Sequence, residues 1–196
     1  MSPKLTDKEY WTGFTGNEFG MIGDSRARLQ RTLSEMTNPD ERIVNLMCGK
    51  YAYVHSTLGI DIAEQMLKEN TKIDDYLVWD INDSTKPYPI EDGSFDTAVM
   101  ISGIAYLRHP QHTFSETRRI LGPKGKFIVG YDRNQTPRGT QKWKKLNNEA
   151  RLQMLQGLYS HAGFREQEAI ELSISLGFEA FDIGPKIFYL VTARKL

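Results

Sequence analysis

Two acidic residues lie where the chain is best placed to bind a polar ligand. Asp61 ends the apolar run 57–60, and Asp80 ends the run 76–79. Runs of this kind are typical of buried parallel strands, and ligands of such sheets bind beyond the carboxyl ends of the strands. A carboxylate in that place can accept hydrogen bonds from the hydroxyl groups of a ribose.

The stretch 42–61 contains the turn that would bring backbone close to the same ligand. An apolar run at 43–47 is followed by Cys48-Gly49, and then by the second run and Asp61. A strand, a glycine turn, a strand and a terminal acid are the parts of a nucleotide-binding α/β sheet. Only one glycine is present where nucleotide loops carry several. The alternative is therefore a pair of core strands joined by a turn, with Asp61 on the surface.

Candidate acid–base groups are few. Tyr106 and His109 follow the predicted fourth strand and could reach a ligand at the same edge, and His55 lies in the short loop. The alternative for each of these histidines is an exposed loop side chain, while His161 falls inside a late helix and is interpreted as structural. No Cys/His cluster has metal-ligand spacing, and neither a Gly-x-Ser-x-Gly elbow nor a P-loop is present.

Strand and helix patterns alternate along most of the chain, which predicts one mostly parallel sheet. Stop signals such as Asn38-Pro39 and Gly122-Pro123 end the predicted helices. The last two strands lack an intervening helix and are expected to pair antiparallel through 177–185. The predicted strands are 43–47, 57–60, 76–79, 95–101, 126–131, 168–174 and 187–192, and the predicted helices are 24–36, 62–70, 112–121 and 148–162.

Length and composition exclude several classes of protein. The chain has 196 residues, enough for one domain with its own core. Its 25 basic and 25 acidic residues cancel, so no overall field attracts nucleic acid or an anionic membrane, and neither partner is expected. A single cysteine, the lack of a long apolar run and the lack of a secretory signal favour a cytoplasmic protein. The oligomeric state is not predicted.

The first 23 residues carry glycines and aromatic rings without a strand or helix period. They are interpreted either as an arm packed on the domain or as a lid over a pocket. We expect an aromatic arm and helix at 1–39, followed by one compact domain at 40–196.

Four segments together resemble the class I S-adenosylmethionine-dependent methyltransferases. Residues 59–67 (GIDIAEQML) are similar to that family's "GvDiSeeML", and residues 90–99 (IEDGSFDTAV) to its "pFpdnsFDaVv". Residues 114–129 (FSETRRILGPKGKFIV) resemble "l.Ei.RvLkPgG.liv", and residues 158–164 (LYSHAGF) resemble "l..aGF". The resemblance implies a Rossmann-like α/β sandwich with seven strands in the order 3-2-1-4-5-7-6 and strand seven antiparallel.

The same resemblance implies S-adenosylmethionine as cofactor and a role for individual residues. Asp61 would bind the ribose, with Ile62 and Met66 packed on the adenine. Asp80 and Ile81 would bind the edge of the adenine. Cys48 and Gly49 would line the methionine part, and Asn45 stands where the family has an acid. Ile101 and Ser102 would lie near the sulfonium methyl, with Tyr106 and His109 as candidate catalytic residues.

The first loop departs from the family pattern. Where the family has roughly "DlGCGtG", this chain has residues 45–51 (NLMCGKY), so Met47 and Tyr51 replace glycines. Only about ten residues separate Gly49 from Gly59, too few for a crossover helix and a strand. This shortening resembles a compact branch of methyltransferase-like proteins.

Three functions are compatible with these features. The first is methylation of a small molecule with S-adenosylmethionine, which Asp61 and Asp80 favour. The second is a binding or regulatory protein of the same fold, and the third is other chemistry in the same pocket, such as a cyclisation. Met47, Tyr51 and the shortened loop favour the second and third. The methyl acceptor is not predicted.

Overall fold

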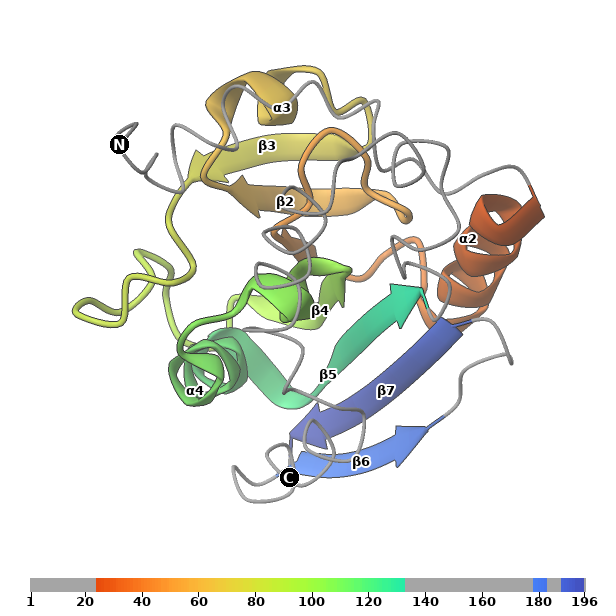
Figure 1. Cartoon of the computed structure of the whole chain (residues 1–196). Coiled ribbons are helices and arrows are strands. Elements are labelled where there is room, and N and C mark those ends of the chain that lie inside the picture. The colour runs from red at the N-terminus through yellow and green to blue at the C-terminus, as the bar shows by residue number, and fades with distance from the viewer. Residues whose placement is uncertain (1–23, 133–177, 183–187, 196) are drawn as a thin grey trace, which may run out of the picture.

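The computed structural model describes residues 24–132, 178–182 and 188–195. They form one seven-stranded sheet with the order β3-β2-β1-β4-β5-β7-β6 (Figure 1). Strands β1 to β5 run parallel, while β7 is antiparallel to both β5 and β6. The strands are β1 (Ile43–Leu46), β2 (Ser56–Asp61), β3 (Ile73–Val78), β4 (Phe95–Ile101), β5 (Leu121–Asp132), β6 (Phe178–Asp182) and β7 (Phe188–Lys195), and the helices are α2 (Asp24–Met36), α3 (Glu64–Lys68), the 3-10 helix η1 (Gly103–Tyr106) and α4 (Pro110–Ile120). The predicted Rossmann-like α/β fold, with parallel order 3-2-1-4-5, is confirmed.

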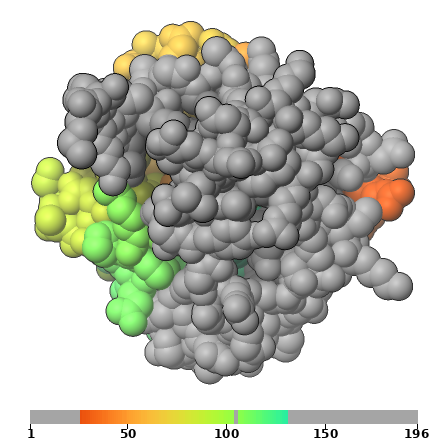
Figure 2. Space-filling view, viewed as in Figure 1, coloured from red at the N-terminus to blue at the C-terminus, as the bar shows by residue number. Residues whose placement is uncertain are grey.

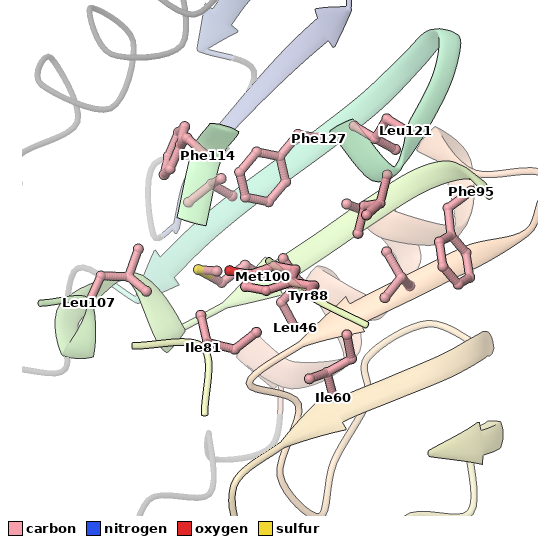
Figure 3. Packing of buried hydrophobic residues seen from close by; sticks show 14 residues of the cluster. Leu46, Ile60, Ile81, Tyr88, Phe95, Met100, Leu107, Phe114, Leu121 and Phe127 are labelled. Carbon is pink, nitrogen blue, oxygen red and sulfur yellow. The ribbon is translucent and has the colours of Figure 1, made fainter. Parts of the chain in front are cut away.

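The central strands are buried on both faces because their side chains alternate between two apolar clusters. On β4, Ala98 and Met100 belong to the cluster on the α4 face, and Val99 and Ile101 belong to the cluster on the α2 face. Figure 3 shows the first cluster, in which Phe114 of α4 points toward Phe127 of β5. Their ring centroids lie 5.0 Å apart at an interplanar angle of 69°. Truncating either ring would cost about 3–5 kcal/mol of stability.

Helix α2 covers the other face of the sheet. Leu29 and Leu33 lie one turn apart on the same side of the helix, and both are completely buried against Ile43 and Ile128. The bounds of α2 are those that the sequence predicted. The strand β4 also has its predicted bounds, so the elements that bury most apolar surface are the ones that the sequence signals best.

Arg119 of α4 joins the helix to the segment before β4. Its guanidinium donates to the carbonyl oxygens of Tyr88 (2.9 Å) and Ile90 (2.7 Å) and pairs with Glu116 and Asp92. Burial would raise the pKa of Glu116, but hydrogen bonds from Arg119 and from the Tyr88 N–H outweigh it and lower that pKa. This arginine lies in the segment 114–129 that carries the family resemblance, so that motif has a structural role here.

The largest differences between the predicted and observed elements concern three strands. Strand β3 begins at Ile73 instead of residue 76, because its exposed first half forms the edge of the described sheet and has no apolar signal. Strand β5 begins at Leu121, and Gly122–Gly125 form an irregularity in its pairing with β4. Strand β6 occupies 178–182, which we expected to be a connection. The strand predicted at 168–174 and the helix at 148–162 lie outside the described residues.

No helix in the described ranges is long and apolar enough to cross a membrane. Figure 2, drawn from the same side as Figure 1, shows α3 at the top of the molecule and the segment between β3 and β4 at the left. Helix α4 lies below that segment on the same surface. The division into an arm at 1–39 and a domain at 40–196 stays a prediction.

Candidate functional site

The candidate site is built from the loops that follow β1, β2, β3 and β4. Because these strands are parallel neighbours, all of the loops leave the same edge of the sheet. Direct contacts join them in sequence. Gly49 bonds to Asp61, the N–H of Trp79 donates to the carbonyl oxygen of Asp61 (3.0 Å), and Asn82 donates to the carbonyl oxygen of Tyr106 (3.0 Å). The two predicted acids, Asp61 and Asp80, thus lie on adjoining loops.

The carboxylate of Asp61 is held by backbone N–H groups at this edge. One carboxylate oxygen, Oδ2, accepts from the backbone N–H of Gly49 at 2.9 Å, and Oδ1 accepts from the N–H of Ala63 at 2.9 Å. Burial raises the pKa of Asp61, and the backbone N–H donors oppose that rise. The carboxylate has more lone-pair positions than these donors use, so it can still accept from a ligand hydroxyl.

The loop between β1 and β2 contains no helix in residues 47–55, as the short spacing predicted. Several of its backbone N–H groups form hydrogen bonds inside the protein. The N–H of Cys48 donates to Ile60 O (3.3 Å), that of Gly49 to Asp61, and that of Tyr51 to Cys48 O (3.2 Å). Lys50, which could have paired with a ligand carboxylate, forms an ion pair with Glu69 instead.

The other face of this loop lies against α2 and α3. The guanidinium carbon of Arg26 is 4.4 Å from the centroid of the Tyr51 ring, a cation–π contact from α2. Asn70, which follows α3, donates from Nδ2 to the carbonyl oxygen of Gly49 at 2.9 Å. Sequence reasoning missed Asn70, because its position after α3 gives no sign that it contacts the first loop.

Two of the site loops contain strained backbone next to the strands. Met47 has φ 53° and Ser102 has φ 64°, values that residues other than glycine rarely adopt. A side chain on Gly103 would approach Met47 Cβ and Sδ to 3.0 and 3.1 Å, so the loops after β1 and β4 meet there. The hydroxyl of Ser102 and the indole N–H of Trp79 are buried without a hydrogen-bond partner among the described residues.

Asn82 was a second omission of the sequence analysis. Its side chain donates to Tyr106 O and accepts from the N–H of Arg108 at 2.7 Å. Asp80 Oδ1 in turn accepts from the N–H of Asn82 at 2.9 Å. Asn82 therefore joins the predicted adenine-binding loop to the predicted substrate loop, and the only sequence signal was its place two residues after Asp80.

Three of the predicted site residues direct their side chains into the protein. Asn45 is 2 % exposed and donates to Ser56 Oγ at 3.4 Å. Ile81 is buried in the cluster on the α4 face (Figure 3), and Ile101 in the cluster on the α2 face. A ligand contact from Ile81 or Ile101 would therefore have to come from its backbone.

The remaining predicted cofactor residues lie around Gly49. Met66 Sδ would lie 3.6 Å from a Cβ on Gly49, and Ile62 is half-buried next to Asp61 in the chain. Burial, and then the negative charge of Asp61, raise the pKa of the Cys48 thiol, so it stays protonated and unreactive at neutral pH.

The candidate catalytic residues lie at the end of η1 and just after it. Tyr106 is half-buried, and His109 is exposed at the N-terminus of α4, where its carbonyl oxygen accepts from the N–H of Thr113 at 3.1 Å. His55 directly precedes β2, at the opposite edge of the sheet, and its Nε2 lies 3.4 Å from Asp74 Oδ1. It is therefore remote from the candidate site. The aromatic residues at 1–23 and His161 lie outside the described ranges.

The comparison with protein families agrees with the geometry. A family model described as "Methyltransferase domain" matches residues 42–129. This range begins just before β1 and ends within β5, and so includes all of the loops described above. The predicted resemblance to the class I S-adenosylmethionine-dependent methyltransferases is confirmed over the matched segment.

Solved structures with the same fold are distant in sequence. One is an S-adenosylmethionine-dependent methyltransferase, possibly a histamine N-methyltransferase, from Thermotoga maritima, at 18% identity and a TM-score of 0.62 over 87% of this chain and 89% of that one. Another is an S-adenosylmethionine-dependent methyltransferase from Mesorhizobium loti, at 18% identity and a TM-score of 0.60 over 90% of this chain and 100% of that one. The [4+2]-cyclase SpnF is similar at 16% identity and a TM-score of 0.59 over 86% of this chain and 80% of that one. No curated protein sequence matches the chain.

Proposed function

We propose that the protein is an S-adenosylmethionine-dependent methyltransferase that acts on a small molecule in the cytoplasm. The observation that carries the proposal is the Asp61 carboxylate, which the Gly49 and Ala63 N–H groups hold at the carboxyl end of β2 within the segment that matches a methyltransferase domain. A fixed acid at that place suits the two hydroxyl groups of a ribose. The balanced net charge favours a small substrate over nucleic acid.

The residues around Asp61 fit a nucleoside. Gly49 presents no side chain between Met66 and Asp61, and a Cβ there would lie 3.6 Å from Met66 Sδ and 4.0 Å from Asp61 Oδ2. An adenosine would use the lone pairs of Asp61 for its ribose, Met66 and Ile62 for the adenine face, and Asp80 for the exocyclic amine. S-adenosylmethionine supplies an electrophilic methyl group when it is bound.

The chain's own task in such a reaction is to align the acceptor, because proximity and orientation lower the barrier by several kcal/mol. Ser102 and Tyr106 lie on the loop after β4 that would face the methyl group. Ser102 has a hydroxyl without a partner among the described residues and a backbone fixed in a strained conformation, both of which suit contact with a substrate. His109 is the candidate base for an acceptor that must lose a proton.

A second candidate is a protein of the same fold that does not transfer methyl groups and instead binds a nucleoside-containing ligand or catalyses another reaction. The engaged donors of the loop 47–55 favour it, because Gly49 N–H is already bonded to Asp61 and Lys50 is paired with Glu69. A methionine carboxylate would find few donors there.

Isothermal titration of the purified protein with S-adenosylmethionine, S-adenosylhomocysteine and adenosine tests the proposal. We expect saturable binding that is weakened in Asp61→Ala and kept in Asp75→Ala, an exposed acid of β3. Binding that does not respond to Asp61→Ala would refute the site. Binding without methyl transfer to any acceptor in a small-molecule panel would favour the second candidate.

A further inference from the structure

Asn70 lies after the end of α3 and is 7% exposed. Its side chain forms three hydrogen bonds. Nδ2 donates to Gly49 O at 2.9 Å, and Oδ1 accepts from Lys72 N at 3.1 Å and from Ala52 N at 3.5 Å. The bond to Lys72 is a local turn of the chain, whereas the other two hold the loop 47–55.

Gly49 is consequently fixed on both sides. Its N–H donates to Asp61 Oδ2, and its carbonyl oxygen accepts from Asn70. Its φ of +49° is one that glycine adopts without strain. Gly49 is therefore held by two side chains, that of Asp61 at the end of β2 and that of Asn70 after α3, and neither of them belongs to the loop.

We propose that Asn70 is a positioning residue that takes the place of the absent crossover helix, fixing the loop 47–55 so that the Gly49 N–H holds Asp61 in its ligand-binding orientation. A parallel connection is normally held by its helix, whose first turn directs backbone N–H groups to the ligand. In this chain no helix is present at 47–55, and a buried amide makes the contacts instead. The ligand-binding part of this inference rests on the proposed function, but the loop part does not.

The neighbouring ion pair cannot fill the same role. Lys50 and Glu69 have side chains that are 27% and 41% exposed, and pairs in contact with water contribute little to holding a loop. The Asn70 amide is buried, so a lost bond to Gly49 leaves a partly buried carbonyl oxygen without its donor.

The test compares Asn70→Ser with Thr97→Val. A serine at 70 can still accept from Lys72 N, as serine does in local turns, but it is too short to reach Gly49. Thr97 is buried in β4 and donates to Glu41, away from the candidate site. Thr97→Val therefore shows how the loss of a hydrogen bond far from the loop 47–55 affects the protein.

Amide hydrogen exchange of the ligand-free proteins is the first measurement. We expect exchange of peptides covering 47–54 to be faster by about tenfold or more in Asn70→Ser, and unchanged in Thr97→Val at the same loss of melting temperature. Exchange that is unchanged at 47–54 in Asn70→Ser would overturn the proposal, whatever the protein binds. Asn70→Asp is a second variant for use if the serine variant does not fold. It keeps the size of the side chain but places an oxygen opposite Gly49 O, so we expect it to accelerate exchange at 47–54 to the same extent.

Adenosine titration is the second measurement. We expect Asn70→Ser to weaken adenosine binding by about tenfold, and Thr97→Val to leave it within about twofold. Faster exchange with unchanged adenosine affinity would overturn the role in binding. Wild-type protein that binds none of adenosine, S-adenosylmethionine and S-adenosylhomocysteine would refute the proposed function, and the exchange measurement would still decide whether Asn70 fixes the loop.

Discussion

The backbone N–H of Gly49 lies 2.9 Å from Asp61 Oδ2, and this bond joins the loop after β1 to the end of β2. Asp61 therefore has two roles in the proposed site. It fixes the loop through one lone pair of Oδ2, and it offers its remaining lone pairs to a ligand. Changes at Asp61 are expected to affect both the loop and the ligand.

Asp61→Ala should weaken nucleoside binding by about 1–3 kcal/mol, because the ribose hydroxyls lose a charged acceptor. Asp61→Asn should weaken it less, since an amide oxygen still accepts. Titration with adenosine gives both values. Asp75→Ala, which removes an exposed acid of the edge strand β3, is the matched control. An unchanged affinity in Asp61→Ala would show that the role implied by the family resemblance is wrong.

The pH dependence of binding follows from the raised pKa of Asp61. Burial raises that pKa above its ordinary value of 3.8, so ionising Asp61 costs folded-state stability as the pH rises through the raised value. Ligand affinity depends on pH in the opposite direction from stability, because the ligand hydroxyls bind the ionised carboxylate. We expect adenosine affinity to fall with decreasing pH, starting above the pH at which an exposed aspartate would protonate. Affinity that declines equally in Asp61→Asn would assign the titration to another group.

Gly59 is a packing requirement of β2. A Cβ there would lie 2.7 Å from Ile73 Cδ1 and 3.0 Å from Cys48 Sγ, so either the neighbouring strand or the loop must move. We expect Gly59→Ala to lower the free energy of unfolding by about 1–3 kcal/mol in chemical denaturation. In Gly122→Ala the new Cβ would have ordinary contacts at 3.6 Å, and we expect a change within about 0.5 kcal/mol. Equal losses in the two variants would contradict this packing argument.

Arg119→Lys should destabilise the fold, because a lysine cannot donate to Tyr88 O, Ile90 O and Glu116 in the same geometry. We expect a loss of about 2 kcal/mol at neutral pH, measured by denaturation. Glu116 has a lowered folded-state pKa, so its contribution is present above its ordinary value of 4.5 and lost as the pH falls through the lowered value. The difference between wild type and Arg119→Lys should therefore shrink in acid. Arg31→Lys, on the exposed side of α2, controls for the change of side chain.

The fold was predictable wherever local patterns bury apolar surface. Helix α2 and strand β4 have their predicted bounds because both carry continuous signals, a helical face in one and a buried run in the other. Strand β3 was predicted to begin too late because Asp74 and Asp75 are exposed at the edge, where side chains need not be apolar. The edge strand is recognised in the structure by its pairing with β2 alone.

The site was predictable only in part, for a physical reason. The place of Asp61 and Asp80 at one edge of the sheet was predicted because strand ends are visible in the sequence. Asn70 and Asn82 were missed because their contacts, with Gly49 and Tyr106, span 21 and 24 positions and have no periodicity. Long-range hydrogen bonds of single polar side chains leave no local signal. The side-chain directions of Asn45 and Ile101 were likewise set by packing and not by the motif.

The last prediction concerns which half of the cofactor the site holds. The N–H groups of Cys48, Gly49 and Tyr51 are bonded within the protein, and the Lys50 ammonium is paired with Glu69. The methionine carboxylate of a ligand would have to break an existing bond to use any of these groups. The ribose and adenine contacts expected from Asp61, Asp80 and Met66 require no such exchange.

We therefore expect S-adenosylmethionine to bind with a Kd on the order of tens of micromolar or weaker, and adenosine to compete nearly as well as S-adenosylhomocysteine. Lys50→Ala should leave the ratio of the adenosine affinity to the S-adenosylhomocysteine affinity unchanged, because the Lys50 ammonium is already paired with Glu69. Competition titrations with a fluorescent adenosine analogue give both numbers. Submicromolar binding of S-adenosylhomocysteine that adenosine does not displace would mean that the loop 47–55 rearranges to bind the amino-acid part. No binding of any of the three compounds would favour a methyltransferase-fold protein that has lost its cofactor.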